Sequence, residues 1–418
     1  MKYLLWILAL LSLTPAICQA KPKPSPPEPG RLTISLDGAW RSLSSNLSDQ
    51  ALNSWTNQIP PSAEIVEMPI SLQAAKVISD NKATWYWRQT GIPANWKGQL
   101  VRLEFEGLGG QAEIWVNGAR FGPIKGGAGP TWLDVTNGIH PDNTNLFVMR
   151  IDGATTIDGA RLRGIWQSLR LVCTDDAYIE SLLIEPQSRE WANFVLQINN
   201  TTKIHADAEL FLTIYDPHNR KHKLAETQQV VVVSPGLNLA GMLIKVKKAV
   251  QWGPDHPALY PYRLEFRQGL NLLDNKEGVF GFRSVADRDG RLLLNEIPYP
   301  VNAGSINWLD MPAGSALQDT VNGIYQKARS SGIGELIAAA GDPGAIFGEA
   351  DRYGMPLVVE LPADPAEAIT VMKHLFNHPS IIAWLLPKSH NYPADVLSEL
   401  KALDPTRPVI QSLPKPSH

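Results

Sequence analysis

His378-Pro379-Ser380-Ile381-Ile382-Ala383-Trp384 decides how the C-terminal third of this chain folds, and Leu385-Leu386-Pro387 follows it directly. A short apolar run entered through a polar Asn-His-Pro turn is typical of a buried parallel strand. Pro387 has no N–H to donate, so we expect the strand to end there. In a β/α barrel, the C-terminal end of such a strand carries catalytic groups. Here the next residues are Lys388-Ser389-His390, without a carboxylate.

The residues around this stretch alternate between short apolar runs and helix-like segments. The apolar runs span residues 334–339, 357–361 and 381–386, and the helical patterns span 316–330, 342–353, 365–376 and 394–403. Such alternation predicts βαβ units and a parallel sheet. About 130 residues hold three or four such units, whereas a closed eight-unit barrel needs ~200 or more. We therefore expect residues 285–418 to form a partial, TIM-barrel-like domain, an incomplete (β/α) barrel.

The stretch also resembles a strand of glycoside hydrolase family 2 (β-galactosidases, β-glucuronidases and β-mannosidases) that reads roughly His-Pro-Ser-Ile-Ile-x-Trp-Ser-x-Gly-Asn-Glu. The resemblance implies that the final Glu is the general acid/base, and that position holds Ser389 here. The family's nucleophile lies on a much later strand, whereas only 418 − 389 = 29 residues follow Ser389. A retaining glycosidase needs two carboxyl groups about 5–5.5 Å apart. The resemblance therefore predicts a truncated and catalytically degenerate member.

Residues 31–175 read as a β domain. Trp85-Tyr86-Trp87-Arg88 alternates like a strand, and Asn117-Gly118 is a strong hairpin signal. Strands at this spacing favour a jelly roll or β-sandwich. Together with Arg163-Gly164-Ile165-Trp166, these blocks resemble the family's sugar-binding domain. The resemblance implies that loops 126–130 and 158–164 face a substrate pocket; the alternative is that they only hold the fold together.

Residues 176–284 predict a second β domain. Apolar runs of strand length are separated by polar turns such as Asp216-Pro217-His218-Asn219 and Ser234-Pro235-Gly236. This spacing favours an immunoglobulin-like β-sandwich without a disulfide. Trp252-Gly253-Pro254 and Phe280-Gly281-Phe282-Arg283 resemble signatures of the family's middle domain, which we expect to act as a spacer.

The N-terminus predicts export. Lys2, an apolar run from Tyr3 to Leu13 and small residues up to Ala20 are typical of a signal peptide at residues 1–20. Residues 21–30 contain five prolines and predict an extended linker. We expect a secreted or periplasmic protein with no membrane span after signal cleavage. Cys173 would then be the one remaining cysteine, packed in a strand.

Composition narrows the classes of partner. A net charge of −3 argues against nucleic acid held by electrostatics. The nine histidines show no paired Cys/His spacing, so we predict no metal site and no cofactor.

Five residues are candidates for contact with a ligand. Glu360 and Glu335 are the candidate catalytic carboxylates. Glu360 would end a strand at the rim of the sheet, where it contacts a sugar or pairs with a cation. We list Trp308, Glu360, His390 and Arg163 as candidate carbohydrate-binding residues.

Three functions remain open. The preferred one is an exported pseudoenzyme that recognises a carbohydrate, such as a β-glycoside, without hydrolysing it. The second is an active β-glycosidase that uses displaced carboxylates or a completing partner chain. The third is an envelope scaffold, in which a protein partner or a homo-oligomer covers the open half-barrel, because open sheets leave apolar edges that need cover.

Overall fold

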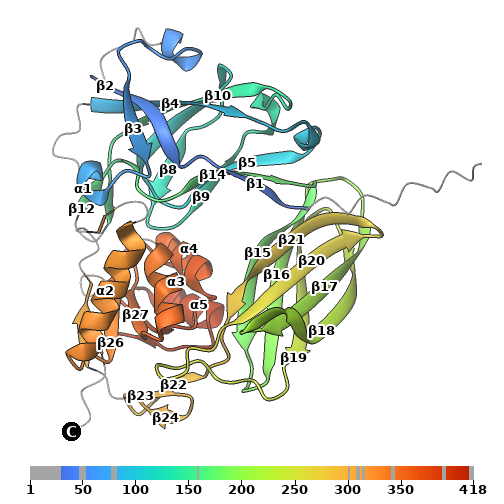
Figure 1. Ribbon diagram of the computed structural model, residues 1–418, viewed down its shortest axis with the longest axis vertical. Helices are drawn as coiled ribbons and strands as arrows, with labels where there is room; N and C mark the ends of the chain where they lie inside the picture. Colours follow the sequence, from blue (N-terminus) through green and yellow to red (C-terminus); the bar gives the residue numbers. More distant parts are fainter. Residues whose placement is uncertain are drawn as a thin grey trace, which may run out of the picture.

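The computed structural model describes residues 30–46, 53–76, 82–157, 160–299, 302–306, 311–312, 316–339, 344–387 and 392–413. Along the chain it has a jelly-roll-like β domain, an immunoglobulin-like β-sandwich and a C-terminal α/β part (Figure 1). The prediction of a mainly β protein with these two β domains is confirmed.

Two main sheets form the first part. Its strands are β1 (Leu32–Ser35), β2 (Gly38–Asn46), β3 (Glu64–Met68), β4 (Lys82–Gly91), β5 (Leu100–Phe105), β6 (Leu108–Val116), β7 (Ala119–Arg120), β8 (Ile124–Gly127), β9 (Thr131–Asp134), β10 (Thr144–Asp152), β11 (Thr155–Ile157), β12 (Ala160–Leu162), β13 (Gly164–Ile165) and β14 (Leu169–Thr174). The sheets have the orders β1-β14-β5-β9 and β13-β6-β10-β4-β2-β3, and β7 and β8 pair with β6. The short helices are α1 (Leu72–Ala75), η1 (Asn53–Thr56), η2 (Ala94–Trp96) and η3 (Thr136–Gly138).

The turn at Asn117-Gly118 joins β6 to β7 as predicted, with φ angles of 51° and 83°. Two successive positive φ angles match the twist of a tight hairpin.

The second part is a sandwich of a three-stranded and a four-stranded sheet. Its strands are β15 (Ala177–Pro186), β16 (Trp191–Asn200), β17 (Ala206–Asp216), β18 (Asn219–Val233), β19 (Gly236–Lys245), β20 (Tyr260–Gln268) and β21 (Asn271–Phe280). The sheet orders are β15-β16-β19 and β18-β17-β20-β21. Phe194, Phe266 and Phe280 pack in the core between them.

The C-terminal part begins with a small antiparallel sheet and continues as a parallel one. The small sheet contains β22 (Val285–Arg288), β23 (Arg291–Leu294) and β24 (Ile297–Pro298). The parallel sheet contains β25 (Ala303–Ser305), β26 (Glu335–Ala339), β27 (Leu357–Glu360), β28 (Ile381–Leu385) and β29 (Val409–Ile410), in chain order. Its helices are α2 (Ala316–Ser330), α3 (Gly344–Tyr353), α4 (Pro365–Leu375) and α5 (Ala394–Leu403).

Strand β28 lies in the apolar run at residues 381–386, where the sequence predicted a strand. All five of its residues are buried between β27 and β29, which explains why the run lacks the alternation of a half-exposed strand. Helix α4 begins where the sequence provides a cap, because the Asp364 side chain accepts a hydrogen bond from the Glu367 N–H and Pro365 follows it. No helix in the described part is long and apolar enough to span a membrane.

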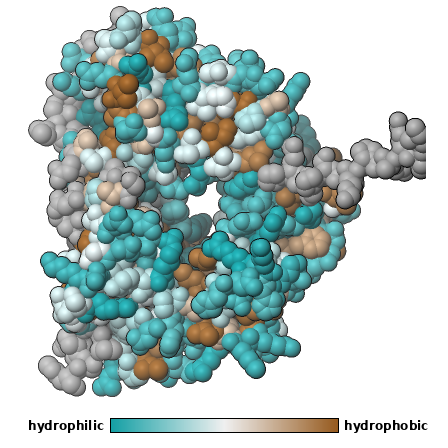
Figure 2. Space-filling model, viewed as in Figure 1, coloured by the Kyte–Doolittle hydropathy of each residue, from teal (hydrophilic) through white to brown (hydrophobic). Residues whose placement is uncertain are grey.

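The three parts meet at separate joints around an opening that is visible in the space-filling view (Figure 2). The jelly roll meets the sandwich where Arg31 pairs with Asp274. The sandwich meets the C-terminal part where the Asn377 amide bonds the backbone of Leu182 and Ile184. The jelly roll also lies against α4, because a Cβ at Gly129 would come within 2.7 Å of the Thr370 side chain.

Candidate functional site

Glu360 ends β27 at the edge where the C-termini of the parallel strands meet. Its backbone pairs with Ala339 of β26 and Leu385 of β28, so it lies in the middle of this edge. The side chain is partly exposed. This is the position expected from the sequence, at the side of the sheet where β/α proteins carry their functional groups.

Glu335 lies at the opposite end of the sheet, because it is the first residue of β26. Register pairs Ala339, four residues later, with Glu360. At about 3.3 Å per residue, the two glutamates are separated by about 13 Å along the strand. That separation exceeds the carboxyl spacing of either class of glycosidase, about 5–9.5 Å. Because β26 and β27 are parallel, Glu335 at the start of one and Glu360 at the end of the other lie at opposite ends of the sheet. The prediction that these displaced carboxylates act as a pair is therefore wrong.

Burial governs the chemistry of Glu335. The residue is 0% exposed, and burial raises the pKa of its carboxyl to about 7. The backbone N–H of Asn302 lies close enough to offset part of this rise without completing a hydrogen bond of normal geometry. The side chain is therefore a buried acid with no access to a ligand at the opposite edge.

Arg163 is occupied by the backbone of its own domain. Its guanidinium donates hydrogen bonds to the carbonyl oxygens of Gly153 and Lys82, and its N–H donates to the carbonyl of Ala75. These contacts hold the segment between β12 and β13 in place. They support a structural role in place of the sugar contact that we expected.

The loop at residues 126–130 packs against helix α4. A Cβ at Gly127 would lie 3.1 Å from the Glu367 carboxylate, and Ala128 is buried. The expectation that this loop faces an open substrate pocket is therefore corrected: it forms a joint between two parts of the chain. The other expected loop, 158–164, is described only from Ala160 onward.

Trp308, Ser389 and His390 lie outside the described residues. Their proposed roles at the rim of the sheet stay predictions.

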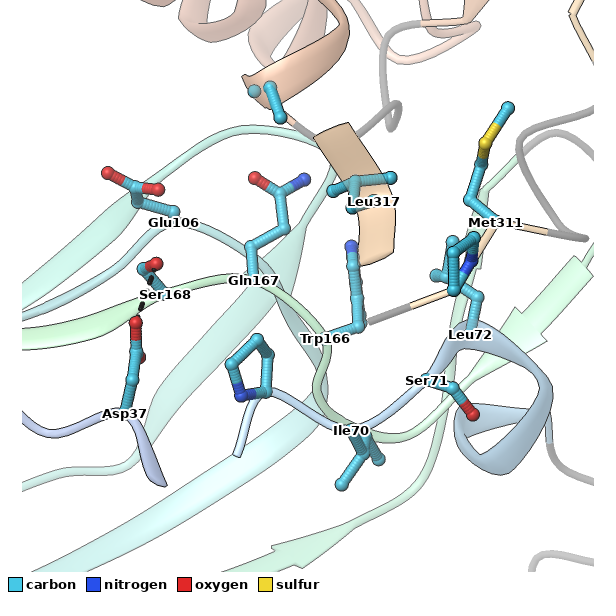
Figure 3. A pocket seen from close by; sticks show the side chains of 14 residues that line it. Asp37, Ile70, Ser71, Leu72, Glu106, Trp166, Gln167, Ser168, Met311 and Leu317 are labelled. Carbon is cyan, nitrogen blue, oxygen red and sulfur yellow. Dashed lines mark hydrogen bonds between the residues drawn. The ribbon is translucent and has the colours of Figure 1, made fainter. Parts of the chain in front are cut away.

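A hollow of about 240 Å³ lies at the seam between the jelly roll and the C-terminal part (Figure 3). The C-terminal part contributes Met311 and Pro312, which follow β25, Leu317 in the first turn of α2, and the start of α3 at Gly344. These are positions in or beside βα loops, so the hollow opens on the same side of the sheet as Glu360. The jelly roll supplies the rest of the lining: Asp37, Pro69, Ile70, Ser71, Leu72, Glu106, Trp166, Gln167 and Ser168.

Trp166 lines the hollow with a hydrogen-bond donor that has no acceptor among the described residues. Its side chain is 4% exposed, and the indole Nε1–H has no acceptor in the described part of the chain. The ring rises from the jelly roll toward Leu317 (Figure 3). Buried indole N–H groups usually have a partner. An oxygen of a bound ligand would supply one.

Two carboxylates in the lining are held in place by hydrogen bonds within the jelly roll. Asp37 accepts hydrogen bonds from the Ser168 hydroxyl and the Leu169 N–H, both at 2.9 Å. Glu106 accepts from Arg170 Nη1 at 2.5 Å. A hollow with apolar walls and a few oriented polar groups suits a small polar ligand that also has apolar faces, as a sugar ring does.

Sequence reasoning found a motif at this seam but not the residues that it meets. The Arg163-Gly164-Ile165-Trp166 block was identified as part of a β domain. Its approach to Met311 and Leu317 joins residues more than a hundred positions apart, and no periodicity in the sequence carries that information.

The described part contains no group of three or more His, Cys, Asp or Glu side chains that could hold a metal ion.

Comparison with known proteins matches both β domains to one family. Residues 34–174 match the sugar binding domain of glycosyl hydrolases family 2, and residues 177–283 match a further model of glycosyl hydrolases family 2. A β-galactosidase of Thermoanaerobacter pseudethanolicus is 25% identical over 249 residues, which cover 57% of this chain and 33% of that protein. A β-galactosidase of Leuconostoc mesenteroides is 22% identical, and the match covers 82% of this chain and 36% of that protein.

Solved structures have the same fold. A glycosyl hydrolase family 2 member from Bacteroides cellulosilyticus superposes with a TM-score of 0.75 at 19% identity, covering 90% of this chain and 55% of that one. The chain spans about a third of the length of the two β-galactosidases. Matches to both family models, in the family's order, lead to one conclusion: this chain belongs to glycosyl hydrolase family 2.

Proposed function

We propose that this protein is an exported member of the family that recognises a carbohydrate in the hollow around Trp166 and does not hydrolyse it. One observation carries the proposal: the unused indole N–H of Trp166 lies in a hollow between a sugar-binding-type domain and the βα-loop side of a parallel sheet. A sugar hydroxyl is the matching acceptor, and the apolar lining can contact the C–H face of a sugar ring.

The absence of hydrolysis rests on two arguments. The position that the resemblance assigns to the acid/base holds Ser389, whose hydroxyl cannot protonate a leaving group as a carboxylic acid does. The candidate carboxylates Glu335 and Glu360 lie at opposite ends of β26 and β27 and cannot face one acetal. The same two arguments count against an active β-glycosidase.

We further infer that strands β25–β29 are the first strands of a β/α barrel. Their order in the sheet follows the chain, all their pairings are parallel, and helices α2, α3, α4 and α5 separate them. This pattern is that of consecutive barrel units, and it supports placing Glu360 at a ligand-facing rim. Export rests on the signal-peptide pattern at residues 1–20.

Binding and hydrolysis can be tested on the same preparation. We expect no release of nitrophenol from nitrophenyl β-galactoside, β-glucuronide or β-mannoside, and we expect binding of at least one glycan on an array, confirmed by calorimetry. Turnover that is lost in Glu360→Gln would overturn the non-hydrolytic assignment.

Trp166→Phe tests the hollow itself, because it removes the N–H and keeps most of the packing. Loss of one hydrogen bond should weaken binding about tenfold. The matched control is Trp132→Phe, on a tryptophan that is 46% exposed and does not line the hollow. If no carbohydrate binds, or if both variants bind like the original protein, the proposed site is wrong.

A further inference from the structure

Exposed leucines gather on strand β19 of the immunoglobulin-like sandwich. Leu237 is 61% exposed, Leu239 is 74% exposed and Leu243 is 54% exposed. They alternate with the inward-facing Met242 and Ile244, so the leucines form one row on the outer face of the three-stranded sheet. Rows of this kind on a soluble protein mark an interaction surface.

The neighbouring strand β16 has no charged side chain opposite the leucines that would keep this surface hydrated. The outward side chains of β16 that face the row are Asn193, Gln197 and Asn199, with Val195 opposite Gly241. The three amides are already engaged across the sheet with Glu185, Ser181 and Tyr178. The polar groups of this face are therefore mostly satisfied inside it.

Strand β19 is also the last strand of its sheet among the described residues, at the side of the sandwich that it shares with β18 (Figure 1). Edge strands usually carry charges or proline that block pairing with another chain. From Gly236 to Ile244, β19 has neither, and Lys245 is its first charged residue. The edge strand β3 is different, because its exposed Ile65 lies next to Glu64 and is followed by Glu67.

The sequence of β19 is self-complementary. Leu239-Ala240-Gly241-Met242-Leu243 has a leucine on each side of Gly241 at equal distance. In an antiparallel pairing of two copies centred on Gly241, each Leu239 lies opposite the other copy's Leu243 and each Leu237 lies opposite Lys245. No two like charges meet in this register. A surface that matches itself about a twofold axis is what a symmetric dimer requires.

We propose that β19 pairs with β19 of a second copy of this chain, antiparallel and centred on Gly241. The two three-stranded sheets then join into one six-stranded sheet, and the leucine rows form a shared apolar strip. The missing side chain at Gly241 leaves room on the axis, where the nearest atom to a Cβ, Asn193 Oδ1, lies at 3.5 Å. The proposal stands independently of carbohydrate recognition.

Sedimentation equilibrium of the whole chain tests the association. We expect a dimer that Leu239→Lys weakens at least about a hundredfold, because each dimer loses two buried leucines. Leu239 is 74% exposed in the single chain, so at concentrations low enough for both proteins to be monomeric, Leu239→Lys should hardly change the melting temperature. The matched control, Ile65→Lys, adds the same charge to an exposed aliphatic position on another edge strand and should leave the dimer intact.

Cysteine substitutions test the register in a Cys18→Ser background. Directly opposed residues of an antiparallel pair have Cα atoms about 4.5–5.5 Å apart, within disulfide range. Gly241→Cys should therefore crosslink two copies rapidly on mild oxidation, and Leu237→Cys should not. The proposal is overturned if the chain is a monomer at all concentrations. It is also overturned if the dimer survives Leu239→Lys or if both cysteine variants crosslink equally. Either of these two results would indicate a different surface or a partner peptide.

Discussion

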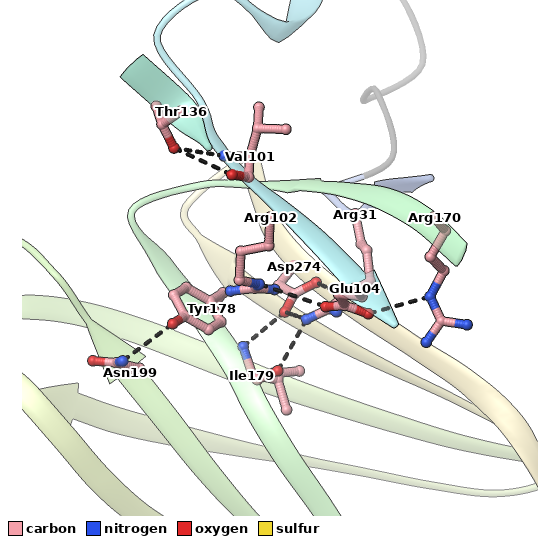
Figure 4. Close-up of polar contacts among 10 residues, drawn as sticks. All are labelled: Arg31, Val101, Arg102, Glu104, Thr136, Arg170, Tyr178, Ile179, Asn199 and Asp274. Carbon is pink, nitrogen blue, oxygen red and sulfur yellow. Dashed lines mark hydrogen bonds and ion pairs between the residues drawn. The ribbon is translucent and has the colours of Figure 1, made fainter. Parts of the chain in front are cut away.

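Asp274 and Glu335 are both fully buried carboxylates, and their surroundings contrast. At the joint between the jelly roll and the sandwich, Asp274 accepts hydrogen bonds from Nε and Nη2 of Arg31 and from the Ile179 N–H (Figure 4). At the start of β26, neither carboxyl oxygen of Glu335 accepts a hydrogen bond of normal geometry from the described residues. A buried charge is stable when it is paired, and otherwise the group favours its neutral form. We therefore expect the stability of the joint to depend on the charge of Arg31, and the contribution of Glu335 to stability to depend on pH.

The largest expected effect is at the joint. Arg31→Met removes the two hydrogen bonds that the guanidinium donates to Asp274 and leaves a carboxylate of 0% exposure without this cation. We expect the free energy of unfolding to fall by about 3–5 kcal/mol, measured by urea denaturation near neutral pH. Arg31→Lys, which keeps the charge but not the two-pronged geometry, should cost less. A loss below about 1 kcal/mol in Arg31→Met would show that the pair does not secure the joint.

Replacing Glu335 should stabilise the protein, whereas replacing Arg31 should destabilise it. The folded pKa of Glu335, about 7, lies above the ordinary value of 4.5, so folding favours the neutral acid. That contribution is complete below pH 4.5 and is lost as the pH rises through 7. Glu335→Met should therefore stabilise the protein at pH 8, by about 1–3 kcal/mol. The gain should shrink toward pH 4.5, measured as melting temperature across this range. A difference that does not change with pH would contradict the assignment.

A smaller effect is expected from backbone packing at the joint. A Cβ at Gly30 would lie 2.6 Å from the backbone nitrogen of Asp274 and 2.8 Å from the Leu272 carbonyl oxygen. Neither atom belongs to a flexible side chain, so Gly30→Ala should destabilise the protein by about 1–2 kcal/mol. Gly91→Ala is the matched control, since nothing lies within 4 Å of its Cβ position. Equal unfolding midpoints for the two variants would show that residue 30 is not held against β21.

The smallest effect is kinetic and reports opening of the joint. Cys173 lies opposite Leu32, the residue after Arg31, and burial raises the pKa of its thiol to about 12. Because the thiolate is the reactive form, labelling by a disulfide reagent in a Cys18→Ser background should be slow in the native protein. Arg31→Met should accelerate it. Fast labelling of Cys173 in the protein that retains Arg31 would mean that β1 leaves the sheet readily.

Much of the fold was predictable because it follows local rules. The unbroken apolar run at 381–386 predicted a strand buried on both faces, and β28 is buried throughout. Asn117-Gly118 predicted the β6–β7 hairpin because few residues accept positive φ. Glu360 was placed at a strand end from the same pattern.

The candidate site was less predictable. The predicted runs at 334–339 and 357–361 put Glu335 near the start of one strand and Glu360 near the end of the next, but the register that separates their side chains comes only from the pairing of Ala339 with Glu360. Likewise, Trp166 reads as a packing residue until Met311 and Leu317 are seen across the hollow from it.

The sequence by itself determined the order of the three parts, the strands and helices within them, and the resemblance that led to the family, because periodicity, turn residues and short motifs act over a few neighbouring positions. The tertiary structure alone decided which groups share a space: Arg31 with Asp274, Trp166 with Leu317, and Glu335 with no ligand-facing neighbour. Burial and pairing arise from contacts between segments far apart in the chain, and those contacts set the energy of a charge or an unused donor.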